Sequence, residues 1–216
     1  MPRATGGSSR RSTGWPGIEA GAHDGRWAVV CPPDREERSV HIVEATDADL
    51  ADVLHVERAA FGQEDEAELV ANLLADPTAQ PLLSLIAREG ERAVGHILFT
   101  AARIEGAPDV SATLLAPRAV MPDAQKRGIG GALIGRGVEL LAEGGADLVF
   151  VAGHPGYYPR HGFEVAGRLG FAPPYPIPEK DADAWMVRAL TTGLVGSVSG
   201  KVICAEALDR PEYWRE

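Results

Sequence analysis

The sequence predicts an α/β protein, because segments with strand patterns and segments with helical patterns follow one another along the chain. The clearest passage is a mostly apolar segment, Leu114–Met121, followed by a glycine-rich turn at residues 125–131 and a helical pattern over Ile129–Glu143. A second observation is Leu148–Ala152, which is nearly all apolar, as a buried strand should be. A third is a hairpin pattern within residues 81–101, where two strand-like segments meet at a glycine-containing turn.

The composition is that of an ordinary soluble globular protein. The chain has 216 residues, enough for one large domain or one domain with tails. Hydrophobic residues make up 45% and charged residues 24%, which are ordinary fractions for a protein of this kind. The formal net charge of -10 argues against nucleic-acid backbone as the main partner and mildly favours a cationic or neutral substrate.

The chain contains two cysteines, Cys31 and Cys204, and no Cys-x-x-Cys motif, so it has no disulfide framework. Both thiols are expected to be inert in a reducing cytoplasm, which is the predicted location. No apolar run reaches membrane-spanning length, and no cluster of His, Cys and Asp has metal-ligand spacing. Neither a membrane nor a metal ion is therefore expected as a partner.

Composition divides the chain into three regions. Residues 1–38 are rich in Gly, Ser, Arg and Pro, lack apolar periodicity, and are predicted to be a disordered tail. Residues 39–192 carry the strand and helix patterns and form the predicted domain. Residues 193–216 are predicted to be a C-terminal extension that docks on the domain, because they end with the aromatic residues Tyr213 and Trp214.

The domain is predicted to begin with a strand, Val40–Glu44, followed by two helices. Thr46 and Asp49 resemble a capping box, and apolar residues then recur at helical spacing until Gly62 closes the first helix. A second helix is predicted over residues 64–75, where an apolar stripe ends at an Asp-Pro stop.

The sheet is predicted to continue with strands at residues 81–87 and 93–101 and with a third arm at residues 112–121. The helix Ile129–Glu143 follows. Its predicted core face consists of apolar residues at helical spacing, namely Ile129, Leu133, Leu140 and Leu141.

Two glycines inside this helix, Gly135 and Gly137, weaken it by roughly 1 kcal/mol each relative to Ala. Close packing on the sheet is the expected reason for them. Late strands are predicted at residues 163–167 and 184–190, with the proline-rich segment 171–178 between them as a loop. This loop is either a rigid connection or part of the wall of a substrate pocket.

The turn before the helix at Ile129 is suited to bind a pyrophosphate. Glycines at 128, 130 and 131 let backbone N–H groups approach a ligand without a side chain in the way. The helix start adds the positive end of its dipole and free N–H donors. Lys126 and Arg127 add positive charge.

Two common nucleotide-binding motifs do not match. The third glycine of the dinucleotide fingerprint would fall on Leu133. A P-loop needs Gly-Lys followed by Ser or Thr, and the nearest candidate, Gly196–Val202, is one residue short and ends in Val. A glycine-rich strand–helix corner with a solvated basic pair is the structural alternative to a binding loop.

The pattern Gln125-x-x-Gly128-x-Gly130 resembles the acyl-CoA pyrophosphate loop of the GNAT N-acetyltransferases. In that family a hydrophobic strand ending in Val-x-Pro usually precedes the loop, and Val120-Met121-Pro122 fits. A Tyr often lies four residues before a Gly-Phe pair in this family, and Tyr158 stands four residues before Gly162-Phe163. The residues 153–163 are similar to the branch of predicted GNAT enzymes often labelled YhbS-like.

The resemblance covers Val40 to about Leu190 and implies a mixed, twisted sheet flanked by helices, which is the acyl-CoA N-acyltransferase fold. It implies acetyl-CoA as the cosubstrate. The implied coenzyme-binding residues lie in the glycine-rich turn and at the end of the strand before it: Ala119, Val120, Met121, Gln125, Lys126, Arg127, Gly128, Ile129, Gly130 and Gly131.

The implied reaction is transfer of the acetyl group of acetyl-CoA to an amine by direct attack. Main-chain N–H groups near Val120 would polarise the thioester carbonyl. Tyr158 would protonate the leaving thiolate as the general acid, since the pKa values of a phenol and a thiol are close. The general base is not identified from the sequence, and Glu57, His154, His161 and a water chain are the alternatives.

Arg118 departs from the family pattern, which usually has an apolar residue beside the thioester. It either pairs with an acidic acceptor or points away into solvent. The expected acceptor is a small-molecule or peptide amine, and a homodimer is left open. The alternatives to an enzyme of this kind are a non-catalytic acyl-CoA sensor domain and a toxin-type enzyme that acts on charged tRNA. The acidic charge balance argues against the tRNA enzyme.

Overall fold

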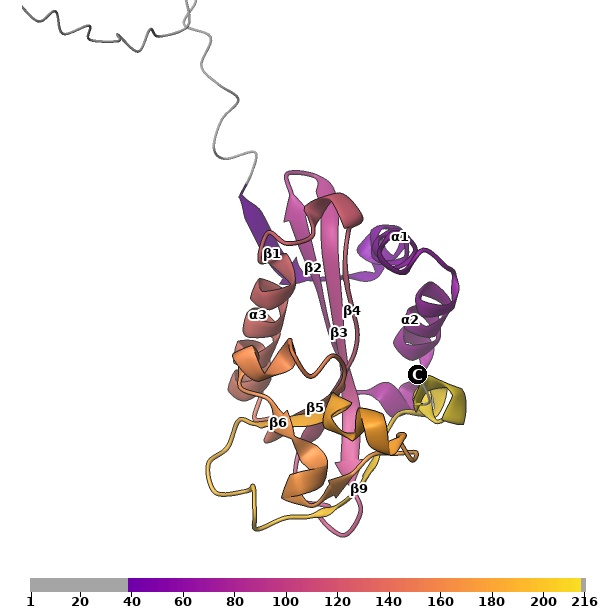
Figure 1. The fold of residues 1–216 in the computed structure, drawn as a ribbon. Helices are drawn as coiled ribbons and strands as arrows, with labels where there is room; N and C mark the ends of the chain where they lie inside the picture. Colours follow the sequence, from indigo (N-terminus) through magenta and orange to yellow (C-terminus); the bar gives the residue numbers. More distant parts are fainter. Residues whose placement is uncertain (1–38, 215–216) are drawn as a thin grey trace, which may run out of the picture. The chain divides into compact units, whose positions relative to one another are not determined.

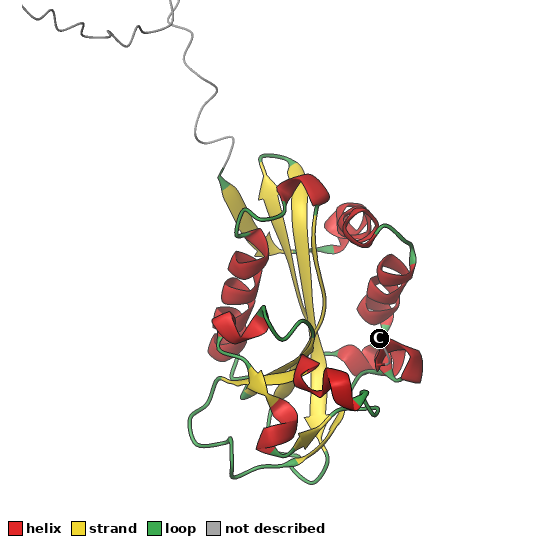
Figure 2. Ribbon diagram, viewed as in Figure 1, coloured by secondary structure: helices red, strands yellow, loops and turns green. Residues whose placement is uncertain are grey.

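The computed structural model describes residues 39–214, which form a nine-stranded sheet with helices on both faces (Figures 1 and 2). The mixed, helix-flanked sheet implied by the family resemblance is thereby confirmed. The predicted tail at residues 1–38 and Cys31 lie outside the described residues. Within residues 39–214 the structure has no helix that is long and apolar enough to cross a membrane.

The main sheet combines antiparallel and parallel pairs. In their order across the sheet, the strands are β1 (Val40–Glu44), β2 (Leu83–Glu89), β3 (Arg92–Ile104), β4 (Ala112–Val120), β5 (Leu148–Ala152), β8 (Trp185–Ala189) and β6 (Glu164–Val165). The first four strands form antiparallel pairs, whereas β4 and β5 run parallel. Strands β8 and β6 then add antiparallel pairs beyond β5. The parallel pair of β4 and β5 lies in the middle of this order, beside the predicted site.

The α-helices are α1 (Leu50–Phe61), α2 (Asp65–Ala75) and α3 (Ile129–Glu143). Helices α1 and α2 cover one side of the sheet and α3 covers the other (Figure 1). The predicted capping box of Thr46 and Asp49 is present before α1. Gly62 ends α1 in the left-handed conformation, with φ of 76° and its N–H donating to the Arg58 carbonyl. The predicted first and third helices are confirmed. They could be predicted because local end signals decide where each helix starts and stops.

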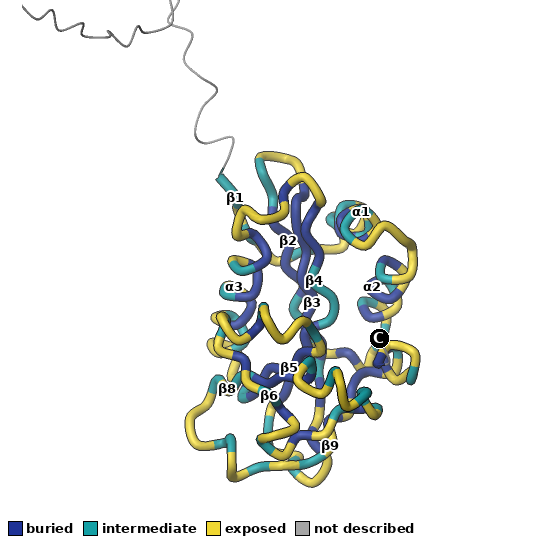
Figure 3. Tube along the Cα trace, in the orientation of Figure 1, coloured by how far each residue is buried: buried dark blue, intermediate teal, exposed yellow. Residues whose placement is uncertain are grey.

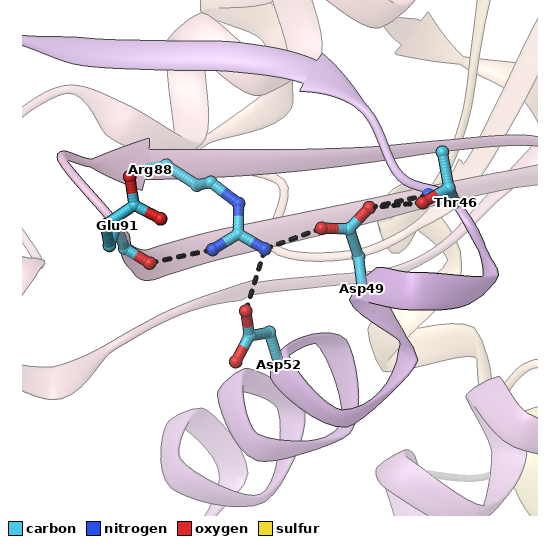
Figure 4. Close-up of polar contacts among 5 residues, drawn as sticks. All are labelled: Thr46, Asp49, Asp52, Arg88 and Glu91. Carbon is cyan, nitrogen blue, oxygen red and sulfur yellow. Dashed lines mark hydrogen bonds and ion pairs between the residues drawn. The ribbon is translucent and has the colours of Figure 1, made fainter.

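The N-terminus of α1 is fixed to the hairpin between β2 and β3 by one arginine (Figure 4). The Arg88 guanidinium donates to Asp49 at 2.6 Å, to Asp52 at 2.7 Å and to the Glu91 carbonyl oxygen at 2.8 Å. Backbone and side-chain hydrogen bonds from Thr46, followed by Arg88, hold the pKa of Asp49 down at about 2. These contacts position α1 over the sheet, and the C-terminal end of α1 reaches the candidate site.

The core lies along β3, β4 and β5, which are mostly dark blue in Figure 3. Helix α3 contributes a buried face of Ile129, Leu133, Ile134 and Val138. The predicted core face includes two of these residues, Ile129 and Leu133, and two that pack against the edge of the core, Leu140 and Leu141. Leu140 and Leu141 are only partly buried, because they lie in the last turn beside the exposed residues 142–145.

The two glycines within α3 have different reasons. A Cβ atom on Gly137 would lie 2.3 Å from Cε2 of the fully buried Phe99, whereas a Cβ atom on Gly135 would meet nothing within 4 Å. Close packing therefore explains Gly137 and not Gly135. A side chain at position 135 would have room, so packing does not require glycine there.

Alanine substitutions should separate the two positions. Gly135→Ala is expected to raise the free energy of unfolding by about 0.5–1 kcal/mol, the helix-propensity difference. Gly137→Ala should lower it by about 1 kcal/mol or more, because overpacking against Phe99 exceeds that gain. Urea unfolding of both variants checks this, and equal shifts in the same direction would contradict it.

The C-terminal part of the chain makes the pairings that the sequence did not predict. The segment 171–178, expected to be a loop, begins with β7 (Phe171–Ala172), which pairs in parallel with β9 (Gly200–Ile203). Strand β9 also pairs with β3. Trp214 is buried and packs edge-on against Trp185, with ring centroids 5.8 Å apart. The loop prediction was wrong at Phe171 because this side chain is fully buried in a contact between distant parts of the chain.

Two smaller points concern a late strand, which differs from the prediction, and Cys204, which agrees with it. The strand predicted at residues 163–167 is only two residues long, Glu164–Val165, because a 3₁₀ turn begins at Ala166. Cys204 is free and buried, and burial raises the pKa of its thiol to about 11. The thiol therefore stays protonated near neutral pH, as an inert cysteine should.

Candidate active site

Strands β4 and β5 diverge in the middle of the sheet. Their parallel pairing runs from Ala112 to Leu115 on β4 and ends at Val151 on β5. Strand β4 continues to Val120, and Pro117, which has no N–H to donate, lies just beyond the last paired residue. The register of β4 with β3 shifts in the same place. A gap therefore opens beside the end of β4, where the resemblance places the thioester.

The loop after β4 curls around the start of α3. Lys126 has a φ of 61° and Gly128 a φ of 86°, so two residues of this short loop adopt the left-handed conformation. Gln125 ties the loop to the strand, because its Nε2 donates to the Val120 carbonyl oxygen at 3.2 Å. Among the described residues, no side chain caps the N-terminus of α3, and its first turn has no acidic residue. The first N–H groups of α3 and its positive dipole end are thus available to an anion.

A cleft of about 740 Å³ lies between this loop, the end of β4 and the end of α1. Its walls include most of the predicted coenzyme-binding residues: Ala119, Val120, Gln125, Lys126, Gly128, Ile129, Gly130 and Gly131. They also include residues outside the predicted coenzyme-binding set: Arg118 and the candidate base His161, which the sequence analysis named for other roles, and Ala60, Phe61, Ala124, Tyr157 and Arg160.

Two predicted coenzyme-binding residues lie outside this lining. Met121 is buried at the end of β4, where its N–H donates to the Val94 carbonyl oxygen at 3.0 Å. Arg127 is exposed and forms an ion pair with Glu89 on β2, which raises the pKa of the guanidinium. The charge of Arg127 is therefore already paired within the protein.

The cleft is positively charged. Arg118, Lys126 and Arg160 line it, and its described lining contains no Asp or Glu. Arg118 and Arg160 both stack on Tyr157, with their Cζ atoms 4.6 Å and 4.9 Å from the centroid of the ring. Within an acidic chain, this local excess of cations favours an anionic ligand.

Two buried nitrogen atoms in the cleft make no hydrogen bond to any described residue, the Nε of Arg118 and the Nε2 of His161. Both lie at the start of α3. A Cβ atom on Gly130 would be 2.2 Å from the Arg118 Nη1, and a Cβ atom on Gly131 would be 3.0 Å from the His161 Cε1. Unpaired buried donors and acceptors are costly, so these atoms call for a polar partner. The residues present therefore fit a pyrophosphate such as that of CoA.

Burial lowers the pKa of His161, and the charges of Arg160 and then Arg118 lower it further. The imidazole is therefore neutral at physiological pH. A neutral ring has one nitrogen that donates and one that accepts, so His161 can either donate to a phosphate oxygen or accept a proton.

The neighbouring tyrosines are placed differently. Tyr157 lines the cleft, and a Cβ atom on Gly130 would be 3.1 Å from its hydroxyl oxygen. Tyr158 lies behind it, only 7% exposed, with its ring against Gly153 and edge-on to Phe163. Burial raises the pKa of the Tyr158 phenol, and the positive charge of Arg118 opposes this rise. Tyr158 thus sits just beyond the end of β5, on the far side of the gap from β4.

Glu57, a candidate base, is fully buried on the inner face of α1. Its Oε1 lies 2.5 Å from Nδ1 of His96, and Nε2 of His96 lies 3.0 Å from the Ser84 hydroxyl. Burial raises the pKa of Glu57, and the bond to His96 opposes this. Glu57 lies one helical turn before Ala60, which lines the cleft, so the pair is close to its wall without being part of it.

His154, another candidate base, also lies outside the cleft lining. It is exposed, and its Nδ1 accepts a hydrogen bond from the Gly156 N–H at 3.0 Å. Among the described residues, no group of three or more His, Cys, Asp or Glu side chains is arranged to hold a metal ion.

Tyr157 and Arg160 were not predicted as site residues. Their position beside Tyr158, in the motif before Gly162-Phe163, was the available signal.

The structure has the acyl-CoA N-acyltransferase fold, with a glycine-rich loop between the central strand β4 and helix α3. The family model for the acetyltransferase (GNAT) domain matches residues 41–166. The chain therefore belongs to the GNAT family of acetyltransferases.

Relatives with this fold include both sequences and solved structures. The uncharacterized N-acetyltransferase YjhQ of Escherichia coli K12 is 48% identical over 168 residues, which are 77% of this chain and 91% of that protein. The GNAT family N-acetyltransferase YhbS of Escherichia coli, solved in complex with CoA, has a TM-score of 0.72 and 27% identity over 79% of this chain and 92% of its own. A GNAT acetyltransferase from Brucella melitensis, solved with acetyl-CoA, has a TM-score of 0.64 and 30% identity over 79% of this chain and 99% of its own.

Proposed function

We propose that this protein is a cytoplasmic N-acetyltransferase that transfers the acetyl group of acetyl-CoA to an amine of a small molecule or peptide. One observation carries the proposal. The cleft joins an uncapped helix N-terminus, the unpaired nitrogens of Arg118 and His161 and the gap between β4 and β5. The two solved relatives with CoA or acetyl-CoA support the choice of ligand.

In this proposal the first turn of α3 holds the pyrophosphate of the coenzyme. Backbone N–H groups from Gly128 to Gly131 are the donors, and Lys126 adds a charge at the mouth of the cleft. The end of β4 presents main-chain groups to the thioester carbonyl, because Pro117 ends the pairing with β5. The acetyl group is then exposed in the gap between β4 and β5.

Proton transfer is assigned to groups on the two sides of the gap. The attacking amine gives up a proton to a base, for which His161 and the Glu57–His96 pair lie nearest the cleft. Tyr158 gives a proton to the departing sulfur as the C–S bond breaks. The chain thus supplies binding, orientation and an acid, and the thioester supplies the activated acetyl group.

The test has two parts. CoA and acetyl-CoA binding to the full chain is measured by calorimetry, and thiol release from acetyl-CoA is measured over a panel of amines. The panel should contain polyamines, amino acids, amino sugars and peptides with free N-termini. We expect CoA binding and amine-dependent thiol release with at least one class. Binding without thiol release over the whole panel would instead support a non-catalytic acyl-CoA sensor, and absence of binding would contradict both.

A further inference from the structure

Three buried polar side chains, which we call the buried triad, connect α1 to the sheet: Ser84 on β2, His96 on β3 and Glu57 on α1. Nε2 of His96 lies 3.0 Å from the Ser84 hydroxyl oxygen, and Nδ1 of His96 lies 2.5 Å from Oε1 of Glu57. His96 and Glu57 are fully buried, and Ser84 is 7% exposed. Of the described residues that line the cleft at α3, none belongs to the triad. The triad is therefore a separate arrangement of hydroxyl, imidazole and carboxylate.

Ser84 is the member of the triad that reaches a second pocket. This pocket, of about 390 Å³, lies between the start of α1, helix α2 and β2, and Ser84 is part of its wall. Because the Ser84 hydroxyl is linked through His96 to α1, it faces the helix side of β2, where the pocket lies. Most of the other lining side chains are apolar, including Leu50, Val53, Leu74 and Leu82. The pocket therefore combines apolar walls with one hydroxyl that is hydrogen-bonded to an imidazole.

The position of Ser84 is fixed from both sides of its strand. Its carbonyl oxygen accepts a hydrogen bond from the Ala45 N–H at 2.8 Å, next to β1. On the other side Ser84 pairs with Leu98 of β3. A reactive group on a strand between two neighbours is held more precisely than one on a loop.

The buried triad is costly for stability, which argues that it is more than a core contact. Oε2 of Glu57 is buried and makes no hydrogen bond to a described residue. A buried carboxyl group with an unpaired oxygen destabilises a fold, and apolar side chains would fill the same space at less cost. The inner neighbours of Glu57 on α1, Val53 and Val56, are apolar and buried. A chemical role accounts for the polar side chains in this apolar layer.

The three side chains have the connectivity of a Ser–His–carboxylate catalytic triad, which is recognised by geometry and not by sequence position. The distance from the Ser84 oxygen to Nε2 is within the range for a serine and its base. With its proton on Nδ1, His96 donates to Glu57 and leaves Nε2 to accept from Ser84. We propose that this pocket is a second catalytic site, in which Ser84 is a nucleophile toward small neutral carboxylic esters. His96 is its base, and Glu57 positions His96.

The lining of the pocket suits this class of substrate. Gln80 is part of its wall, and a carboxamide can donate to the carbonyl oxygen of an ester. Asp47 also lines the pocket, so a neutral ester is favoured over an anionic one. The Ser84 oxygen bonds to the carbonyl carbon while its proton passes to Nε2 of His96, and the alcohol then leaves with that proton. A water molecule, deprotonated by the same nitrogen, bonds to the acyl carbon, releases the acid and restores Ser84.

The first test is covalent labelling. The full chain is treated with diisopropyl fluorophosphate, which bonds to an activated serine oxygen as fluoride leaves, and the labelled peptide is identified by mass spectrometry. We expect a label on Ser84 and loss of this label in Ser84→Ala, with CoA affinity unchanged because Ser84 does not line the cleft. Ser111→Ala removes an exposed serine from the wall of another pocket and is the matched control. A folded wild type that carries no label on Ser84 would overturn the proposal.

The second test measures hydrolysis of p-nitrophenyl butyrate without CoA. Glu57→Gln keeps the size of the side chain and should lower kcat on the order of a hundredfold with little change in KM, because it removes the carboxylate that orients His96. If Glu57→Gln does not fold, as circular dichroism would reveal, Ala71→Leu narrows the pocket at a position outside the triad and should slow labelling of Ser84. A raised KM with unchanged kcat in Glu57→Gln would overturn its positioning role. Equal hydrolysis by the wild type and Ser84→Ala would overturn the site.

Discussion

Tyr158→Phe is expected to lower the turnover of acetyl transfer on the order of a hundredfold at saturating acetyl-CoA, the loss typical of a missing general acid. The substitution keeps the aromatic ring and its packing against Gly153 and Phe163 and removes only the hydroxyl. CoA affinity and the melting temperature should therefore stay at their wild-type values. The measurement is thiol release at steady state, with calorimetry and thermal unfolding on the same protein samples.

Tyr157→Phe is the competing variant, because Tyr157 and not Tyr158 lines the cleft. The Tyr157 hydroxyl lies beside Gly130, on the coenzyme side of the cleft, whereas Tyr158 lies beyond the end of β5. Wild-type turnover in Tyr158→Phe together with a loss in Tyr157→Phe would assign the acid to Tyr157. Tyr213→Phe changes an exposed tyrosine near the C-terminus and is the matched control.

Tyr158→Ala measures what the ring contributes to stability, and its comparison with Tyr158→Phe separates the ring from the hydroxyl. The side chain is only 7% exposed, so its removal should destabilise the fold by roughly 3–5 kcal/mol whatever its chemical role. If the ring is merely structural, Tyr158→Phe is nearly silent and Tyr158→Ala unfolds the protein more readily. If the hydroxyl is the acid, the Phe variant alone loses turnover at full stability.

The parts of the fold that the sequence predicted best depend on signals within a few residues. Gly128 and Gly144 bracket α3, and the predicted Ile129–Glu143 is the helix observed. The capping box of Thr46 and Asp49 and the left-handed Gly62 bracket α1 in the same way. Glycine conformation and cap hydrogen bonds are local properties, so they could be predicted without knowledge of the tertiary structure.

Pairings between distant segments were not predictable in this way. Phe171 and Gly200 pair in the parallel contact of β7 with β9, and neither segment has the length or alternation that identifies a strand. Each forms a strand because the other is present and because Phe171 is buried between them and the core. Such short strands take their conformation from tertiary contacts and not from local preference.

For the candidate site, the sequence named the glycine-rich loop and several side chains, and only the structure shows how those side chains lie relative to the cleft. The loop from Gln125 to Gly131 lines the cleft as a glycine-rich turn should. The burial of Tyr158 behind Tyr157 depends on the contact with Gly153, and the direction of Arg118 depends on where β5 ends. The Glu57–His96 bond requires the register of α1 on β3. These are properties of packed elements, so the sequence could name the residues without placing them.

Gly130→Val is expected to weaken CoA binding more than tenfold, which is about 1.4 kcal/mol or more. Gly130 lies in the first turn of α3, and a side chain there would project into the cleft toward Arg118 and Tyr157. Both neighbouring atoms are the ends of flexible side chains, Nη1 of Arg118 and the hydroxyl of Tyr157, so the fold can accommodate the change. The branched side chain then occupies the space in which the proposal places the pyrophosphate.

The control is Gly135→Val, because it introduces the same β-branched residue into the same helix at a position where a Cβ atom meets nothing within 4 Å. The helix-propensity change is the same in kind for both variants. Any loss of CoA affinity beyond that of Gly135→Val therefore reports on the cleft and not on the stability of α3. Calorimetric titration of CoA into both variants, after circular dichroism has shown that each is folded, makes the comparison. Equal affinities in the two variants would remove the first turn of α3 from the coenzyme site, and the unpaired nitrogens of Arg118 and His161 would then need another ligand.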